Sequence, residues 1–314
     1  MGNIVTLSLN PALDKSTQVE YVIPEEKLRC GVPKWQAGGG GINVARVVKR
    51  LGGSPLAITT VGGPQGIMLR DLLVEEGVNL EVIPIAGLTR ESFAVRETTS
   101  NQQYRFSVPG PVISDAEWQS SLDAIKNLHP KPDYLVLSGG LPPGVPDHFY
   151  GQVAQWAREN EIKVILDTHH EPLRHAIEAG VYLFKPNLRE LRQLTGQKLE
   201  GEQSQRKVLL RIIEDGGAQF IVLSLGAAGA VFANSDGTIH LRTPTVKIRS
   251  KVGAGDSMVG GIVWALANGY APLDAAKFGV SAGAAAVKTP GSELCRRDDV
   301  IELFKQIYEG ELNH

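Results

Sequence analysis

The stretch Val252-Gly253-Ala254-Gly255-Asp256-Ser257 is the most informative part of this chain, because it joins small residues to a carboxylate and a helix start. Apolar residues recur at helical spacing beyond it, which predicts a helix over residues 256–268 that Gly269 ends. Small residues allow close approach of the backbone, and the free N–H groups of a first helical turn attract an anion. A carboxylate beside that anion can accept a proton from an attacking hydroxyl. The pattern therefore indicates phosphoryl transfer to an alcohol, with helix capping by Asp256 as the alternative.

A second glycine cluster, Gly38-Gly39-Gly40-Gly41, precedes Ile42-Asn43 and another helical pattern that stops at Gly52-Gly53. Consecutive glycines form regular structure poorly, so the run indicates a place where a ligand approaches the main chain. Asn43 adds an amide side chain in the first turn of this predicted helix. The run is neither a P-loop nor a dinucleotide-binding fingerprint, since the required spacings are missing. A flexible hinge is the alternative interpretation.

Composition argues against several classes of partner. The 314 residues carry a formal net charge of −2, which gives no electrostatic reason to propose nucleic acid or an anionic membrane as a partner. No apolar run approaches the length of a membrane span, and the first residues lack the pattern of a signal peptide. Cys30 and Cys295 are the two cysteines, which is typical of a reducing compartment. We therefore expect a cytoplasmic protein with neither a nucleic-acid nor a membrane partner.

Short apolar runs alternate with amphipathic segments along the chain. This alternation predicts an α/β fold whose central, mostly parallel sheet has helices on both faces. Ligand sites in such folds lie at the carboxyl ends of the strands, and polar motifs follow several of the predicted strands directly. We expect these motifs to converge at one edge of the sheet. The predicted strands cover residues 4–9, 56–61, 134–137, 164–167, 183–185 and 220–224.

Residues 16–36 and 91–108 lack helical periodicity and contain alternating apolar positions. We predict that they form a small β-sheet lid, whereas residues 1–15, 37–90 and 109–314 form the α/β domain. A small sheet buries itself poorly alone, which favours a homodimer joined through the lids. The basic residues near the lid are either a solvated rim or a phosphate site, and arginine forks suit phosphate well. These residues are Lys27, Arg29, Arg90 and Arg105.

Six motifs, in order along nearly the whole chain, resemble the PfkB (ribokinase-like) family of carbohydrate kinases. Six ordered motifs are far more specific than either glycine run alone. The segments around Lys27, Arg90 and Arg105 are similar to those of the minor-type bacterial 6-phosphofructokinases in this family. The motifs are Asn10-Pro11-Ala12-Leu13-Asp14, residues 38–43, Ser138-Gly139-Gly140-Leu141-Pro142-Pro143-Gly144, Lys185-Pro186-Asn187-Leu188-Arg189-Glu190, Ser224-Leu225-Gly226 and residues 252–257.

The resemblance implies a ribokinase-like fold and an ATP-dependent kinase that phosphorylates the C1 hydroxyl of fructose-6-phosphate to fructose-1,6-bisphosphate. In that reaction Asp256 accepts the hydroxyl proton, and the main-chain amides of Gly253, Ala254 and Gly255 hold the transferring phosphoryl group. ATP and Mg²⁺ are the implied cofactors. The lid is implied to cover the sugar and to form the dimer interface.

The resemblance also implies binding residues at the matched motifs. Glu190 and Asn187 would act on Mg²⁺ through water, although a glutamate in a first turn also stabilises its helix. The implied sugar-phosphate contacts are Asp14, Lys27, Arg29, Gly39, Asn43, Arg90, Arg105 and Gly140. The implied nucleotide contacts are Lys185, Asn187, Ser224, Gly226, Gly229, Val280 and Ala284.

Relatives also bind a monovalent cation, K⁺ in many of them, and the matching positions here are Ser250, Val252, Ala286 and Gly291. Lys251 stands where the family commonly has threonine, which puts K⁺ binding in question. Its ammonium either replaces the cation, with Glu293 as the counter-charge, or points to solvent and leaves the cation site intact.

Two further positions bear on the substrate. Gly140 stands where the phosphosugar kinases of the family usually have serine, so one hydroxyl contact is missing or moved to water. Related 1-phosphofructokinases and tagatose-6-phosphate kinases usually have lysine where this chain has Gly40, which favours fructose-6-phosphate over those two alternatives. A sugar-phosphate sensor without catalysis is the non-enzyme alternative. A cluster of Asp167, His169, His170 and His175 lacks metal-ligand spacing, so we expect ordinary histidines there.

Overall fold

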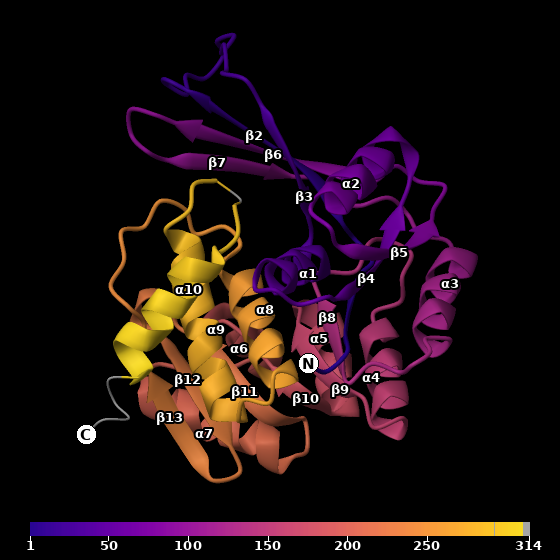
Figure 1. Cartoon of the computed structure of the whole chain (residues 1–314), viewed down its shortest axis with the longest axis vertical. Coiled ribbons are helices and arrows are strands. Elements are labelled where there is room, and N and C mark those ends of the chain that lie inside the picture. The colour runs from indigo at the N-terminus through magenta and orange to yellow at the C-terminus, as the bar shows by residue number, and fades with distance from the viewer. Residues whose placement is uncertain (292, 310–314) are drawn as a thin grey trace.

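The computed structural model describes residues 1–291 and 293–309, and it contains two sheets (Figure 1). The large sheet has nine strands, and all neighbouring pairs from β11 to β5 are parallel. The predicted α/β fold with a mostly parallel sheet is therefore confirmed. In spatial order its strands are β13 (Gly237–Leu241), β12 (Ala230–Asn234), β11 (Ala218–Ser224), β10 (Val181–Phe184), β9 (Lys163–Asp167), β8 (Tyr134–Ser138), β1 (Ile4–Ser8), β4 (Leu56–Val61) and β5 (Asn79–Pro84).

Helices cover both faces of the large sheet, because alternate residues of its strands point to opposite sides. On β1, Ile4 packs into one core, and Val5 and Leu7 pack into the other. The first core is closed by α1 (Gly40–Arg50), α8 (Ala254–Ala267), α9 (Pro272–Val287) and α10 (Arg297–Phe304), which continues into η2 (Lys305–Glu309). The second core is closed by α3 (Asp115–Lys126), α4 (Phe149–Glu159), α5 (His170–Ala179), α6 (Leu188–Thr195) and α7 (Glu202–Glu214). We call this sheet with its helices the body.

Helices α8 and α9 pack unusually closely because their contact is built from small residues. A Cβ placed on Gly261 would lie 2.7 Å from the Cβ of Ala282, and one on Gly279 would lie 2.8 Å from the main-chain oxygen of Met258. Side chains at either glycine would push the helices apart. This contact fixes the N-terminus of α8, which begins at Ala254, two residues earlier than predicted.

A second sheet of four strands stands above the body (Figure 1). Its order is β3 (Lys34–Gly38), β2 (Ala12–Val19), β6 (Arg90–Glu97) and β7 (Gln103–Ser107), and we call it the lid sheet. β6 and β7 form an antiparallel hairpin, as the alternating pattern predicts. The strands extend past the predicted segments, since β2 already begins at Ala12 and β3 reaches Gly38.

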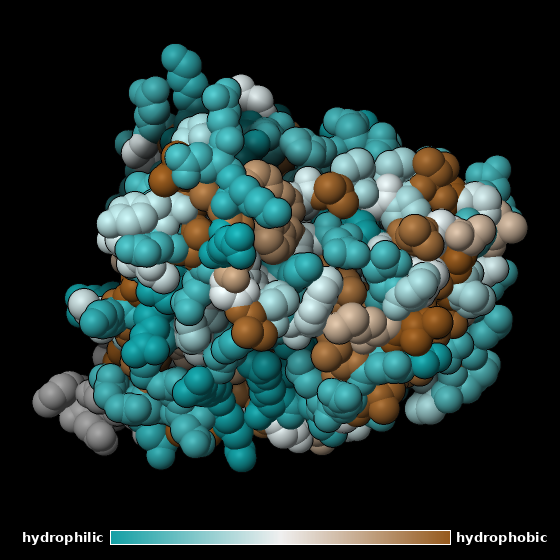
Figure 2. Space-filling view, turned by 90° about the horizontal axis from the view of Figure 1, so that it is seen from above, coloured by the Kyte–Doolittle hydropathy of each residue, from teal (hydrophilic) through white to brown (hydrophobic). Residues whose placement is uncertain are grey.

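The two faces of the lid sheet differ in character. One face carries Asp14, which pairs in register with Gln36 and Ser92, and this polar face turns toward the body. The opposite face carries Trp35 and Phe93, with the ammonium of Lys15 4.7 Å from the Trp35 ring centroid. Seen from above, apolar side chains interrupt the hydrophilic surface of this side of the molecule (Figure 2).

Some elements differ from the sequence-based expectations. Lys185 follows β10 instead of ending it, because the strand spans Val181–Phe184. Strands β5, β12 and β13 were not predicted; β5 and β13 are the edges of the large sheet, and β12 is antiparallel to both of its neighbours. Helix α2 (Gly63–Glu75) packs under β3, and η1 (Gly226–Ala228) is a single turn after β11.

The guanidinium of Arg46 ties three elements together near the lid sheet. Its side chain is 1% exposed, and its Nη2 lies 2.6 Å from Glu76 Oε1 at the end of α2. Its Nη1 donates to the main-chain oxygen of Ala37 on β3 at 2.6 Å. A buried cation needs this compensation, because an unpaired charge in the interior is costly.

Replacing Glu76 with alanine should therefore lower the free energy of unfolding by roughly 3 kcal/mol, because it leaves the buried Arg46 without its counter-charge. Urea denaturation followed by circular dichroism measures the effect. Glu75→Ala is the matched control, since Glu75 is exposed one residue away and should change stability by less than about 0.5 kcal/mol. Equal effects of the two substitutions would contradict this role of the ion pair.

Candidate active site

The N-terminus of α8 offers uncapped donors. Gly253 is its N-cap residue, with φ at 74°, and no side chain caps the helix. The N–H groups of the first turn therefore have no partner within the helix. Lys185 approaches the same place, since a Cβ on Gly255 would lie 3.7 Å from its ammonium. Two independent features thus make this point favourable for an anion.

The carboxylate of Asp256 lies in this first turn. It does not cap α8, and instead its Oδ2 accepts a hydrogen bond of 2.8 Å from Asn43 Nδ2. Burial raises the pKa of Asp256 to about 6, and the negative charge of Asp167 adds to this effect, whereas Asn43 and Lys185 favour the charged form. A carboxylate with this pKa is charged at neutral pH and is a stronger base than an ordinary aspartate.

Arg46 orients Asn43 in turn. Its Nη1 lies 3.3 Å from Asn43 Oδ1, so the oxygen of the amide faces Arg46 and the nitrogen faces Asp256. This role of Arg46 was not predicted from the sequence. The available signal was the spacing of three residues between Asn43 and Arg46, which places both on one side of α1.

Behind Asp256, a buried ion pair joins the ends of two neighbouring strands. Lys185 Nζ lies 3.1 Å from Asp167 Oδ1, and the lysine side chain is 5% exposed. Burial alone would lower the pKa of Lys185, but the charges of Asp167, Glu190 and Asp256 outweigh it and the pKa is raised. Asp167 was set aside in the sequence analysis. The parallel pairing of Phe184 with Leu166 places the next residues, Lys185 and Asp167, side by side.

Glu190 and Asn187 form a reciprocal capping box at the start of α6. Glu190 Oε2 accepts from the Asn187 main-chain N–H at 2.8 Å, and Asn187 Oδ1 accepts from the Glu190 main-chain N–H at 2.9 Å. Burial raises the pKa of Glu190, although nearby Lys185 opposes the shift. The helix-capping interpretation of Glu190 is thus present in the structure, and its role toward Mg²⁺ stays a prediction.

Asp14 lies on the inner face of the lid sheet between two arginines. Burial raises the pKa of Asp14, although Arg105 and Arg90 both favour its charged form. Arg90 is anchored by hydrogen bonds to the main-chain oxygen of Asn10 at 3.2 Å and to Ser107 Oγ at 3.0 Å. A carboxylate flanked by two guanidinium groups presents both an acceptor for hydroxyls and donors for a phosphate.

The remaining predicted sugar contacts are two glycines of the body loops and two exposed basic residues of the lid. Gly39 has φ at 111°, a conformation that favours glycine. Gly140 faces His169, and a Cβ on Gly140 would lie 3.1 Å from the imidazole Cε1. Lys27 and Arg29 lie on the exposed connection between β2 and β3, and within the described part of the chain no contact joins them to Asp14.

The predicted nucleotide contacts fall into two groups. Ser224 forms an isolated parallel β-bridge with Asn187, and the Ser224 Oγ donates to the main-chain oxygen of Pro186 at 3.2 Å. Gly226 and Gly229 lie in the turn that follows Ser224. Val280 and Ala284, in contrast, are 2% and 6% exposed within the core around α9. Core packing accounts for these two residues, and a contact with adenine stays a prediction.

The loops at the predicted cation site favour the interpretation in which Lys251 points to solvent. Lys251 is exposed, whereas Ser250 before it is buried and Val252 after it is half-buried. Glu293 Oε1 pairs with Arg296 Nη2 at 2.8 Å, so it does not serve as the expected counter-charge of Lys251. Ala286 supplies a main-chain oxygen that already accepts from Thr289 Oγ1 at 2.7 Å. Gly291 adopts φ at 64° in the facing loop.

Other chemistry finds little support in this part of the molecule. Within residues 1–291 and 293–309, no group of three His, Cys, Asp or Glu side chains is arranged to hold a metal ion. The rings of His169 and His170 pack against each other with centroids 4.8 Å apart. No helix in the described ranges is long and apolar enough to cross a bilayer.

Comparisons with known proteins agree with this geometry. Residues 9–299 match the pfkB family carbohydrate kinase. The chain is 43% identical over 302 residues to the ATP-dependent 6-phosphofructokinase isozyme 2 of Mycobacterium tuberculosis, covering 96% of this chain and 89% of that protein. The structure of Escherichia coli phosphofructokinase-2 in complex with potassium superposes with a TM-score of 0.94 and 38% identity, covering 98% of this chain and 99% of that one. The same enzyme in complex with fructose-6-phosphate gives a TM-score of 0.92 and 37% identity over 98% and 99% of the two chains. This chain belongs to the PfkB family of carbohydrate kinases.

Proposed function

We propose that this chain is an ATP-dependent 6-phosphofructokinase that transfers the γ-phosphoryl group of ATP to the C1 hydroxyl of fructose-6-phosphate. One observation carries the proposal: the carboxylate of Asp256, with a pKa of about 6, lies in the uncapped first turn of α8. The names of the two similar proteins, from Mycobacterium tuberculosis and Escherichia coli, support the same reaction.

Each group of the site then has a task. Asn43 holds the Asp256 carboxylate toward the acceptor hydroxyl, whose proton moves to Asp256 as the hydroxyl oxygen attacks. The amides of Gly253, Ala254 and Gly255 stabilise the negative charge that develops on the transferring group. Asp14 binds sugar hydroxyls, and Arg90 and Arg105 bind the phosphate already on the sugar.

The residues present also fit a magnesium ion held mainly by the phosphates of ATP. Mg²⁺ keeps most of its waters and takes one or two carboxylates, and Glu190 offers Oε1 while Oε2 caps α6. When bound, the ion neutralises phosphate charge in the transition state. Glu190 and Asn187 would hold the ion through its waters.

The alternative substrates are less well supported. Fructose-1-phosphate and tagatose-6-phosphate kinases are expected to carry lysine at position 40, and here a Cβ on Gly40 would lie 2.7 Å from the main-chain nitrogen of Gly139. The backbone of this chain therefore leaves no room for that lysine. A non-catalytic sensor would have no need for a buried, hydrogen-bonded carboxylate with a raised pKa, because such a group destabilises the fold.

We also propose a cytoplasmic homodimer joined through the lid sheets, with residues 16–36 and 91–108 as the sugar cover. The lid sheet supports this, because Phe106, on the same face as Phe93, is 59% exposed and Val108, just after β7, is 51% exposed. Apolar side chains at such exposure favour burial against a second copy. Cys30 is exposed and Cys295 is buried, and both are free thiols, as a reducing compartment would leave them.

A screen of acceptors tests the proposed reaction. With ATP and Mg²⁺, coupled detection of ADP should show the highest kcat/KM for fructose-6-phosphate, above fructose-1-phosphate, tagatose-6-phosphate, fructose and ribose. Arg90→Ala should cost about 2 kcal/mol of binding to fructose-6-phosphate, because a charge-assisted contact to its phosphate is lost.

Two results would contradict this assignment. Preference for fructose-1-phosphate or tagatose-6-phosphate would show that this phosphosugar is the substrate instead. An unchanged KM for fructose-6-phosphate in Arg90→Ala would show that Arg90 has a structural role in the lid sheet and does not bind the phosphate. Arg211→Ala is the matched control, since Arg211 pairs with Asp215 on the exposed face of α7.

The pKa of Asp256 predicts a pH profile. Because only the carboxylate form accepts a proton, kcat/KM should rise as the pH increases through about 6 and then level off. Asp256→Asn should lower kcat by about 10²–10⁴ with little change in the KM for the sugar. More than a tenth of the activity in this variant, or a flat profile between pH 5 and 7, would sink the role of Asp256 as base.

A stability measurement tests whether the Asp256→Asn variant remains folded. The pKa of Asp256 is raised from 3.8 to about 6 on folding, so the folded state loses stability as the pH rises across this window. Asparagine has no such penalty. Asp256→Asn should therefore be at least as stable as the unsubstituted protein at pH 8.

We further propose that main-chain oxygens of Ser250, Val252, Ala286 and Gly291 bind K⁺, because Lys251 is exposed beside them. Replacing K⁺ by tetramethylammonium at constant ionic strength should lower activity several-fold, and Lys251→Thr should behave in the same way. Activity that does not depend on K⁺, combined with a K⁺ requirement created by Lys251→Thr, would show instead that the ammonium replaces the cation.

A further inference from the structure

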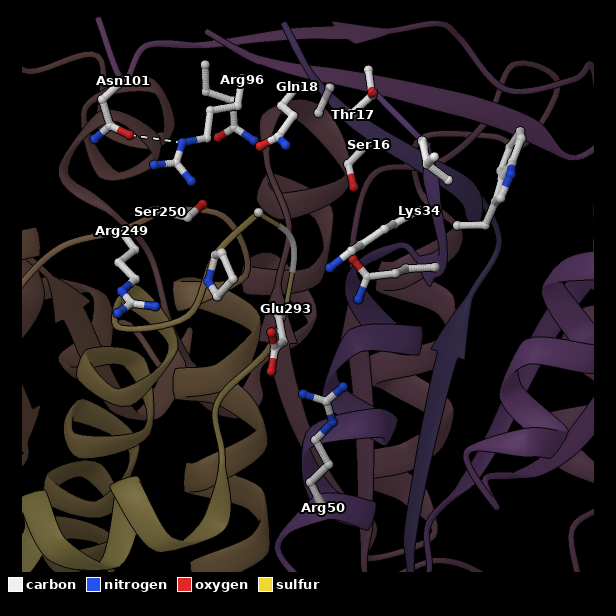
Figure 3. A pocket seen from close by; sticks show the side chains of 17 residues that line it. Ser16, Thr17, Gln18, Lys34, Arg50, Arg96, Asn101, Arg249, Ser250 and Glu293 are labelled. Carbon is white, nitrogen blue, oxygen red and sulfur yellow. Dashed lines mark hydrogen bonds between the residues drawn. The ribbon is translucent and has the colours of Figure 1, made fainter. Parts of the chain in front are cut away.

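A cavity of about 660 Å³ separates the lid sheet from the body beside the predicted cation loops (Figure 3). Its upper wall is the inner face of β2, β3 and β6. Its lower wall is made by the end of α1 and by the loops that carry Ser250 and Glu293. Asp14, Asn43 and Asp256 are not among the residues that line it.

Strand register fixes two cations in the upper wall. Lys34 pairs with Ser16, and Arg96 pairs with Gln18, so the four side chains share the face that carries Asp14. Ser16 lies two residues beyond Asp14 on β2, which corresponds to about 7 Å along the strand. The cavity is therefore a neighbour of the substrate position and continues the same polar face away from it.

Two cations in the lower wall face those of the lid sheet. Arg50 lies at the end of α1, where its Nη1 donates to the main-chain oxygen of Leu294 at 3.1 Å, and Arg249 extends from the loop before Ser250 (Figure 3). Among the described residues of the lining, Glu293 is the single carboxylate, and it already pairs with Arg296. Among the described lining residues, four cationic side chains thus surround the cavity, and the carboxylate present is already neutralised.

Two of these cations have no partner within the described residues. The side chains of Lys34 and Arg249 form neither an ion pair nor a hydrogen bond there, whereas Arg96 Nε donates to Asn101 Oδ1 at 2.9 Å. Like charges on opposite walls repel each other when the lid sheet approaches the body. Salt weakens this repulsion but does not remove it across a gap shorter than the Debye length, about 8 Å at physiological ionic strength.

We propose that this cavity binds a polyvalent phosphate anion, with at least two phosphoryl groups, that bridges the lid sheet and the body. Arginine binds phosphate oxygens bidentately and lysine adds a compact charge, so Arg96 and Lys34 hold one end and Arg50 and Arg249 hold the other. A monovalent anion neutralises one wall at a time, whereas a polyvalent anion contacts both. Its binding therefore holds the lid sheet against the body. This site lies outside the substrate positions of the proposed reaction.

Titration calorimetry of the full chain with inorganic tripolyphosphate tests this site. We expect saturable binding of one anion per chain, weakened at least tenfold by Arg96→Gln and by Arg249→Gln. Lys207→Gln is the matched control, because Lys207 is an exposed lysine on α7 away from the cavity, and it should leave the affinity unchanged. Circular dichroism of each variant verifies folding.

Hydrogen exchange tests the bridge itself. Tripolyphosphate should slow amide exchange in β6 and β7 of the unsubstituted protein, and Arg249→Gln should abolish the effect although Arg249 belongs to the body. A sugar bisphosphate serves as the second probe. If it binds with the same dependence on Arg96 and Arg249, a phosphorylated metabolite is the source of the anion, and if only tripolyphosphate binds, the source carries a polyphosphate chain.

Three outcomes would overturn the proposal. They are the absence of saturable binding, affinity that Arg96→Gln and Arg249→Gln leave unchanged, and displacement of tripolyphosphate by fructose-6-phosphate, which would locate the anion in the substrate cleft. None of them affects the acceptor screen, so failure of this site and failure of the proposed reaction are distinguishable.

Discussion

The hydrogen bond from Asn43 to Asp256 is the contact on which the proposed chemistry depends, because it joins the two glycine-led helices α1 and α8 at their N-termini. A buried carboxylate is unfavourable without such a partner. Asn43 can hold this orientation because Arg46 contacts its oxygen, and Arg46 can be buried because Glu76 neutralises it. The buried, charged carboxylate of Asp256 is thus held by a chain of contacts that reaches α2, well outside the site.

The second support of the site comes from the large sheet. The pairing of β9 with β10 sets Asp167 beside Lys185, and this ion pair faces both Asp256 and Glu190. Asp167 raises the pKa of Asp256, whereas Lys185 lowers it. The two partners therefore shift the pKa of Asp256 in opposite directions, and burial, the largest cause, decides that the pKa is raised. A single lysine without its aspartate would draw the pKa of Asp256 back toward that of an ordinary carboxyl group.

Sequence patterns predicted the elements whose residues show a local periodicity. They failed where the structure depends on contacts between residues that are far apart in the chain. Apolar runs predicted the strand over 56–61 with its observed bounds, and glycine motifs predicted both helix starts near the site. They could not predict Arg46 with Glu76, since these residues lie on different helices and meet only through packing. The antiparallel strands β12 and β13 were missed for a similar reason. Ala230–Asn234 is almost entirely buried by its neighbours, so it lacks the alternation of polar and apolar residues that marks a strand.

The run of four glycines has a physical cause that differs at each position. A Cβ on Gly38 would lie 2.2 Å from Asp14 Oδ2, one on Gly40 would lie 2.4 Å from Ser138 Oγ, and one on Gly41 would lie 2.3 Å from the main-chain oxygen of Leu7. Gly39 needs its positive φ instead. The N-terminus of α1 is therefore wedged between β1, β8 and the lid sheet, which argues against a flexible hinge. Because the backbone is held this tightly, Asn43 projects toward Asp256 from a fixed position, and the glycines make this part of the site rigid.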